Sequence, residues 1–204
     1  FYLQAHHKDI LAINQLSLKG THNALNALVA LAVGDLLKIE RSQILRTLRT
    51  FTGLSHRYEP IGFYHGIEFI KDSKATKVGS TIAALKRAES KGKLHLLRGG
   101  EGKNADFLPL QNVLINHQKN HPNHLIYLYC YGKDKLDLAQ LLPTQTVVVT
   151  TLQEALVKVK QQAKSGDLVL LSPACASLDQ FKNYQDRGNQ FSKIVQVVFN
   201  ENSF

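Results

Sequence analysis

Short apolar segments alternate with amphipathic segments along most of the chain, and this alternation restricts the fold more than any other feature. Apolar runs of about four to eight residues are typical of buried strands, whereas apolar residues spaced three and four apart are typical of helices. We expect a strand pair or hairpin at residues 63–70 and strands at 94–97, 125–130, 147–149 and 168–171. Helices are expected at residues 78–88, 110–118, 133–141, 152–163 and 179–198, with a break in the last at Gly188.

This order of segments predicts an α/β fold, Rossmann-like, with a mostly parallel sheet and flanking helices on both faces. In such folds ligands bind beyond the carboxyl ends of the strands. Three loops follow expected strands and are candidates for a binding site. They are residues 72–77, 98–104 and 172–178.

The first part of the chain has a different hydrophobic pattern. Residues 21–34 carry apolar side chains on nearly every face, which predicts a buried helix that begins at Thr21 as N-cap and stops at Gly34. A second, amphipathic helix is expected around residues 44–51, followed by a linker at 53–60. The chain is therefore predicted to consist of two helices, a linker and an α/β region.

Composition excludes some classes of protein. With 204 residues, 44% hydrophobic and 20% charged, the chain matches a soluble globular protein of one or two domains. The longest apolar run, residues 24–33, is interrupted by Asn26, so no membrane insertion is expected and the protein is predicted to be cytoplasmic. Cys130 and Cys175 are expected to be buried and unpaired. The two cysteines do not form a disulfide framework.

The formal net charge is +9, which is compatible with a polyanionic partner. However, the lysines and arginines are scattered, without a basic run or interleaved aromatic residues, so we expect no nucleic-acid binding. A small phosphorylated ligand explains the charge as well as a nucleic acid does.

The candidate loops are rich in groups that bind anions. Residues 72–77, with the sequence DSKATK, combine one carboxylate, two hydroxyls and two ammonium groups ahead of a helix, although a capped helix with Ser73 or Thr76 as N-cap is an equally good interpretation. Residues 98–104 hold three glycines and Lys103, without the spacing of a Walker A loop. Residues 172–181 follow a buried strand. The alternative to a binding role there is that Ser177 or Asp179 is simply an N-cap. From the residues alone, the prediction is an anion-binding α/β domain.

Four segments resemble the Mur ligase family. Residues 20–26 (GTHNALN) are similar to a segment of its central domain, residues 53–59 (GLSHRYE) to its interdomain junction, and residues 71–76 (KDSKAT) to the end of the next strand. Residues 171–188 are similar to its final motif. The last two segments resemble the members that add D-glutamate. The resemblance implies that residues 1–57 are the tail of the central ATP-binding domain with the hinge, and that residues 58–204 are the C-terminal amino-acid-binding domain.

The resemblance also implies roles for individual residues. Asn23 and Asn26 match positions that contact the adenine end of ATP, Arg57 matches an arginine that reaches a nucleotide phosphate, and Asp72 matches the carboxylate near the ribose. Lys74 matches a catalytic lysine at the reaction centre. The positions that match the D-glutamate site are Thr76, Lys103, Ser177, Leu178 (through its backbone) and Tyr184, which is commonly Phe.

The activity implied is that of an ATP-dependent ligase. It would join D-glutamate to UDP-N-acetylmuramoyl-L-alanine through an acyl phosphate, with Mg²⁺ on the phosphates of ATP, as a monomer. The chain starts at Phe1 and lacks Met, a Walker A loop and metal ligands, so we expect these parts upstream and an isolated chain that is inactive. Lys77 departs from the usual Asn. The alternative function is a non-catalytic anion-binding α/β module.

Overall fold

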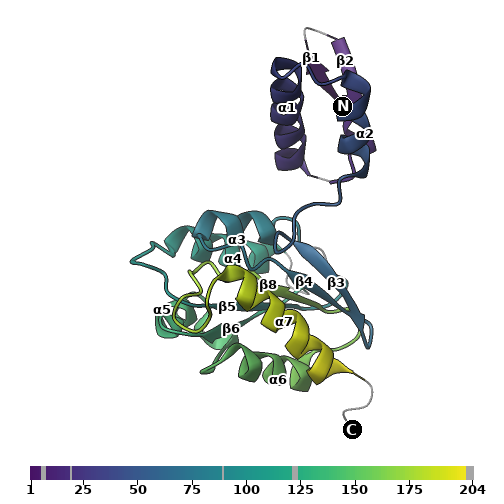
Figure 1. Cartoon of the computed structure of the whole chain (residues 1–204). Coiled ribbons are helices and arrows are strands. Elements are labelled where there is room, and N and C mark those ends of the chain that lie inside the picture. Colours follow the sequence, from purple (N-terminus) through teal and green to yellow (C-terminus); the bar gives the residue numbers. More distant parts are fainter. Residues whose placement is uncertain (6–7, 19, 89, 121–123, 201–204) are drawn as a thin grey trace. The chain divides into compact units, whose positions relative to one another are not determined.

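A computed structural model describes residues 1–5, 8–18, 20–88, 90–120 and 124–200. The chain divides into two compact units, Phe1–Leu54 and Ser55–Phe204. Figure 1 shows the elements of each unit along the chain. The division lies upstream of the one expected after Arg57, so that the whole His56 to Tyr58 segment belongs to the second unit.

The first unit combines a hairpin with two helices. Strands β1 (Tyr2–Ala5) and β2 (Lys8–Ala12) pair antiparallel, and a 3-10 turn at Ile13–Gln15 follows them. Helices α1 (Thr21–Leu36) and α2 (Arg41–Thr50) complete the unit. The two helices were predicted from the sequence, whereas the hairpin was not, because its strands are short. Among the hairpin residues whose burial the structure describes, Leu3 and Leu11 are buried. The core of this unit consists of Leu3, Leu11, Leu16, Ala24, Ala27, Leu31 and Ile44.

The prediction that residues 21–34 form a fully buried helix was wrong. Only one stripe of α1 is buried in this unit, whereas Leu25 and Val29 are 59% and 63% exposed. Gly34 does not end the helix either. It lies against the side chain of Ile44, where a Cβ atom would clash, so the glycine serves the packing of α1 on α2. Thr21 is the first helical residue, and the N-cap is Gly20.

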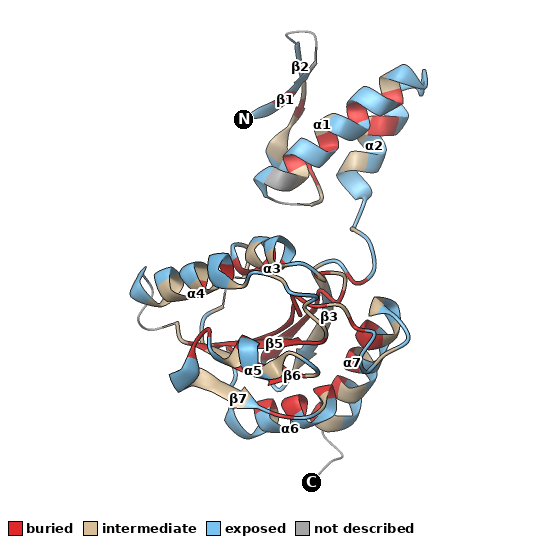
Figure 2. Cartoon of the chain, turned by 90° about the vertical axis from the view of Figure 1, so that its left-hand side faces the viewer, coloured by how far each residue is buried: buried red, intermediate tan, exposed pale blue. Residues whose placement is uncertain are grey.

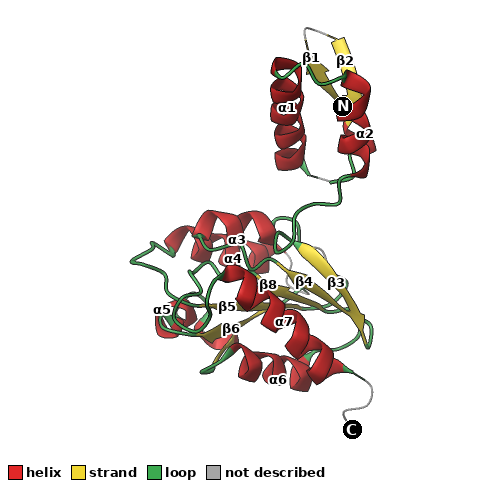
Figure 3. Ribbon diagram, viewed as in Figure 1, coloured by secondary structure: helices red, strands yellow, loops and turns green. Residues whose placement is uncertain are grey.

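The second unit is built on a six-stranded sheet with the order β3-β4-β8-β5-β6-β7. Strand β3 is antiparallel to β4 at one edge, and the other pairs are parallel, as expected for a mostly parallel α/β sheet. Figure 3 shows the sheet between its helices. The strands are β3 (Glu59–Tyr64), β4 (Ile67–Lys71), β5 (Leu94–Gly99), β6 (Ile126–Tyr131), β7 (Thr146–Val148) and β8 (Leu168–Leu171).

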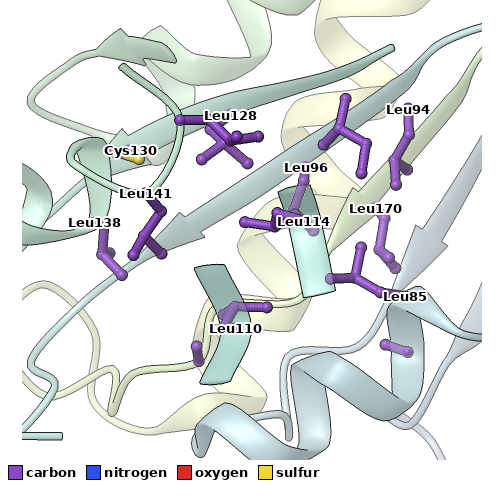
Figure 4. Close-up of a cluster of buried hydrophobic side chains, with 14 of the residues drawn as sticks. Leu85, Leu94, Leu96, Leu110, Leu114, Leu128, Cys130, Leu138, Leu141 and Leu170 are labelled. Carbon is purple, nitrogen blue, oxygen red and sulfur yellow. The ribbon is translucent and has the colours of Figure 1, made fainter. Parts of the chain in front are cut away.

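Helices cover both faces of this sheet. Helices α3 (Val78–Leu85), α4 (Leu108–Asn120) and α5 (Lys135–Ala139) supply one core, whose leucines lie together in Figure 4. Helices α6 (Leu152–Gln162) and α7 (Tyr184–Phe199) supply a second core on the other face. Figure 2 shows the buried strands between helices that are buried on one side only. The Rossmann-like α/β fold expected from the alternating pattern is thus confirmed.

Helix α7 differs from its prediction both in where it begins and in its continuity at Gly188. It begins at Tyr184 rather than near Asp179, because Asn183 is its N-cap and accepts a 2.8 Å hydrogen bond from the amide of Asp186. It also continues through Gly188. A Cβ atom at Gly188 would clash with the imidazole of His56, so this glycine permits a close contact and does not break the helix.

A buried polar network joins the strands near their amino ends. The Nε2 atom of His95 lies 3.0 Å from Oδ2 of Asp167, and its Nδ1 atom lies 2.9 Å from the hydroxyl of Tyr129. Asp167 also accepts hydrogen bonds from the amides of Lys93 and Lys164. Burial lowers the pKa of His95 despite the neighbouring carboxylate. The network therefore joins the strands near their amino ends, opposite the carboxyl ends that carry the candidate loops.

Arg98 on β5 is fully buried, although its position in the sequence predicted a candidate ligand-binding loop. Its three guanidinium nitrogens have no hydrogen-bond partner among the described residues. The Phe107 ring centroid lies 5.9 Å away, and burial lowers the pKa of Arg98 to about 10. Because a buried polar group without a hydrogen-bond partner loses its hydration and gains no hydrogen bond in return, this side chain costs stability.

We therefore expect Arg98→Leu to raise the free energy of unfolding by about 1–3 kcal/mol, the range found for buried polar groups without partners. Urea titration of the wild-type and variant chains measures the change. Leu97→Ala on the same strand is the control and should be destabilising, because Leu97 is a fully buried apolar residue. A less stable Arg98→Leu chain would contradict the unfavourable role of this guanidinium.

Candidate functional site

The carboxyl ends of three neighbouring strands carry the candidate loops. Strand β8 lies between β4 and β5 in the sheet, so the loops that follow these strands leave the same edge side by side. These are the loop after β4, with Lys74 and Thr76, the loop after β5, with Lys103, and the loop after β8, with Ser177. Segments about a hundred residues apart in sequence thereby meet.

Backbone hydrogen bonds join the loops directly. The amides and carbonyls of Glu101 and Ala176 exchange two hydrogen bonds of 2.9 Å and form an antiparallel bridge. This bridge places Ser177 beside the segment that leads to Lys103. The amide of Ala174 donates to the carbonyl of Ala75 at 2.9 Å, which joins the loop after β8 to the loop after β4.

The loop after β6 supports the same edge. The carboxylate of Asp134 accepts a 2.6 Å hydrogen bond from the amide of Gly102, and Lys133 forms a 2.6 Å ion pair with Glu101. Gly100 has φ of 124° and lies so close to the carbonyl of Ala176 that a Cβ atom would clash. Gly100, one of the glycines expected to admit a ligand, thus lets the loop after β8 approach closely. Lys103 itself has φ of 54°, an uncommon conformation for a residue with a side chain.

The loop after β4 is fixed by its own contacts. The carboxylate of Asp72 accepts hydrogen bonds from the amide of Tyr58 at 3.1 Å and from the hydroxyl of Ser172 at 3.0 Å. The amide of Lys74 donates to the carbonyl of His56 at 3.0 Å, so the 55–58 segment packs against this loop. The Lys74 ammonium lies 4.0 Å from the centre of the Tyr184 ring, a cation–π distance.

The predicted residues of this unit differ in their access to solvent. Lys103, Leu178 and Arg57 are exposed, whereas Lys74, Thr76 and Tyr184 are half-buried and Ser177 is 3% exposed. Asp72 is also buried, with both carboxylate oxygens bonded to the protein. The structure thus brings Lys74 and Tyr184 into contact, and places Lys103, Ser177 and Thr76 on adjoining loops.

Arg187 is the residue that the sequence reasoning missed. It is fully buried on α7, and its Nε atom donates to the hydroxyl of Ser73 at 3.0 Å. Its Nη atoms donate to the carbonyls of Gly99 at 3.1 Å, Ser73 at 2.9 Å and Cys175 at 3.1 Å. Arg187 lies within the motif of residues 171–188, but nothing in the sequence indicates that an arginine at this helical position contacts three separate loops.

The first unit holds the two remaining predicted residues. Asn23 and Asn26 line a hollow of about 160 Å³, and Nδ2 of Asn26 lies 3.5 Å from Oδ1 of Asn23. The rest of this hollow is mostly apolar, with Leu48 and Phe51 among its lining residues. Amide groups beside an apolar wall suit a flat ring with polar edges.

Burial shifts the pKa values of Asp72 and His56 in opposite directions. Burial raises the pKa of Asp72 to about 6, although hydrogen bonds from Ser172 and Tyr58 oppose this shift. Burial also lowers the pKa of His56, and the charge of Lys71 acts in the same direction. Within the described part of the chain, no three His, Cys, Asp or Glu side chains are grouped so as to hold a metal ion. No described helix is long and apolar enough to span a membrane.

The fold defines an α/β domain whose candidate loops meet at the carboxyl ends of three parallel strands, and comparison with known proteins identifies its family. Residues 56–175 match the family described as Mur ligase, glutamate ligase domain. The chain is 43% identical to the UDP-N-acetylmuramoylalanine--D-glutamate ligase of Photorhabdus laumondii over 97% of the chain and 44% of that protein. The enzyme of the same name from Escherichia coli K12 is 45% identical over 97% of the chain and 43% of its own length.

Solved structures show the same fold at low identity. MurF from Acinetobacter baumannii superposes with a TM-score of 0.55 and 17% identity over 87% of this chain and 39% of that one. A bifunctional folylpolyglutamate synthase/dihydrofolate synthase from Yersinia pestis CO92 gives 0.62 and 16% over 84% and 40%.

The chain belongs to the Mur ligase family, as the match to its glutamate ligase domain shows. It spans less than half of the length of the curated relatives that it matches. Those relatives are named as ligases, which gives no support to the alternative of a non-catalytic module.

The raised pKa of Asp72 predicts a pH-dependent stability. Below about pH 4 the carboxyl is protonated in both states, whereas between about pH 4 and 6 only the folded chain keeps the proton, so this residue's contribution to stability falls as pH rises to about 6. Asp72→Asn should therefore gain stability relative to wild type as pH rises from 4 to 7. Urea titrations at pH 4, 5, 6 and 7 measure this difference, and a difference that stays constant would contradict the raised pKa.

Proposed function

We propose that this chain is the amino-acid-binding portion of an ATP-dependent ligase that adds D-glutamate to UDP-N-acetylmuramoyl-L-alanine. The observation that carries the proposal is the joining of three loops, with Thr76, Lys103 and Ser177, at one edge of the sheet. The curated relatives, which are named for D-glutamate, narrow the ligand class from small anions to this amino acid.

The groups on these loops suit a ligand with two carboxylates. In the proposal, the exposed ammonium of Lys103 pairs with one carboxylate, and the hydroxyl of Ser177 and the amide of Leu178 donate to the other. Thr76 offers a further hydroxyl, and Tyr184 forms one wall. The Glu101–Ala176 bridge supports this arrangement because it holds the segments of Lys103 and Ser177 together.

The proposed reaction forms an amide. The amine of D-glutamate attacks an activated carboxyl carbon of the nucleotide precursor, the C–N bond forms, the C–O bond to phosphate breaks, and the amine loses a proton. Lys74 is the proposed catalytic residue, because a half-buried ammonium beside the attacked carbon stabilises negative charge that develops there. Tyr184 supports its position through the cation–π contact.

Four further residues are assigned to the nucleotide. We assign Asn23 and Asn26 to the adenine end of ATP, Arg57 to a phosphate and Asp72 to the ribose end. Asp72 must then exchange at least one of its present hydrogen bonds, since Tyr58 and Ser172 occupy its oxygens. Mg²⁺ would neutralise phosphate charge when bound, and its ligands are assigned to a part of the protein outside this chain. Residues 1–57 are proposed as the tail of the nucleotide-binding domain, in a monomeric cytoplasmic protein.

Binding of D-glutamate to the isolated chain tests the amino-acid site. We expect saturable amide shifts at residues 74–76, 101–104 and 176–178 in an NMR titration of the ¹⁵N-labelled chain with D-glutamate, and weaker effects with L-glutamate. Lys103→Ala should weaken binding at least about tenfold, since it removes a hydrogen bond to a charged group.

The matched control is Lys158→Ala, which removes an exposed lysine from α6. It should leave the dissociation constant unchanged. Equal affinities of the wild-type and Lys103→Ala chains would remove Lys103 from the site, and a wild-type chain without shifts in these loops would overturn the amino-acid-binding function.

Turnover tests the ligase itself. The isolated chain is expected to release no phosphate from ATP, whereas a complete protein that carries this chain should release it only when both UDP-N-acetylmuramoyl-L-alanine and D-glutamate are present. Colorimetric phosphate assays with each substrate omitted measure this dependence. Equal turnover with L-lysine or meso-diaminopimelate would assign a different amino acid. Turnover by the isolated chain would contradict the proposal that parts needed for catalysis lie outside it.

A further inference from the structure

We propose that Arg187 is the positioning residue of the amino-acid site, an inference that rests on the proposed function. Its guanidinium does not reach the surface, because the side chain is fully buried. It therefore acts through the loops that it contacts and not by touching the ligand.

The four hydrogen bonds of Arg187 end on the three loops that carry the proposed binding residues. Ser73, which accepts two of them, directly precedes Lys74. Gly99 begins the turn that leads to Lys103, and Cys175 lies two residues before Ser177. One planar group thus sets the distance between the starting points of all three loops.

The chemistry of the acceptors shows why the residue is arginine. In the described part of the chain Arg187 forms no ion pair, and its acceptors are three backbone carbonyls and one hydroxyl. The Nε, Nη1 and Nη2 atoms all donate to these oxygens, an arrangement that a rigid fork of five donors provides and a lysine ammonium does not. The cation also remains beneath loops that are proposed to bind a dicarboxylate, so its charge favours the ligand.

The first turns of α7 bind the loop after β4 at further points. The hydroxyl of Ser73 donates to the carbonyl of Tyr184 at 2.7 Å while it accepts from Arg187. The ring of Tyr184 faces Lys74. Gly188 allows His56 to pack against the helix. The start of α7 is thus a single support for the catalytic and substrate-binding loops.

The test compares Arg187 with a buried polar residue at the other edge of the sheet. We would measure the D-glutamate dissociation constant by NMR, and the melting temperature, for the wild-type chain, Arg187→Lys, Ser73→Ala and Asp167→Asn. Asp167 is the matched control because it also joins several segments through buried hydrogen bonds, but near the amino ends of the strands.

We expect Arg187→Lys to bind D-glutamate at least about tenfold more weakly at a temperature at which it is fully folded, the loss of at least one hydrogen bond to a charged group. Ser73→Ala, which keeps Arg187 but removes one acceptor, should show a smaller loss and remains informative if Arg187→Lys does not fold. Asp167→Asn should lower the melting temperature and leave the dissociation constant unchanged.

Two results would overturn the inference. One is wild-type affinity in Arg187→Lys and Ser73→Ala, and the other is an equal loss of affinity in Asp167→Asn, which would mean that general destabilisation weakens binding. A wild-type chain that binds no D-glutamate counts against the proposed function instead. Hydrogen exchange at the amides of Glu101 and Ala176 then decides the role of Arg187: faster exchange in Arg187→Lys than in Asp167→Asn supports it, and equal exchange contradicts it.

Discussion

The insertion of β8 between β4 and β5 is the constraint on which the rest of the site depends. Because β4, β5 and β8 run parallel, their carboxyl ends share one edge, and the loops that follow them are neighbours although they are far apart in sequence. The bridge between Glu101 and Ala176 and the hydrogen bond from Ala174 to Ala75 form only because the strands are in this order. The site is therefore a consequence of strand order first and of side-chain chemistry second.

Two fully buried arginines differ in whether the burial of the side chain stabilises or destabilises the fold. Arg187 gives its donors to oxygens of three loops and so holds a polar edge together. Arg98 is equally buried, but its nitrogens find no partner in the described part of the chain. Both side chains are removed from water, and of the two only Arg187 forms hydrogen bonds within the described part of the chain.

The glycines near the site have a second explanation besides ligand access. Gly100 and Gly188 lie where a Cβ atom would clash with a neighbouring loop or with His56. Glycine-rich segments of this kind are usually interpreted as ligand cradles, and the structure adds that they let the supporting segments approach one another. Close packing between loops and binding at their outer surface are compatible, since Lys103 and Leu178 remain exposed.

The sequence by itself determined the α/β class, most strands and helices and the three candidate loops, because hydrophobic periodicity and turn residues are local signals. Motif resemblance added the family, which the match over residues 56–175 confirms. The exposed face of α1, the N-terminal hairpin, the late start of α7 and the burial of Arg98 were decided by packing that no local pattern contains. The same is true of Arg187, whose four acceptors come from three distant segments. Only the tertiary structure brings them together, since hydrogen bonds between loops depend on strand order.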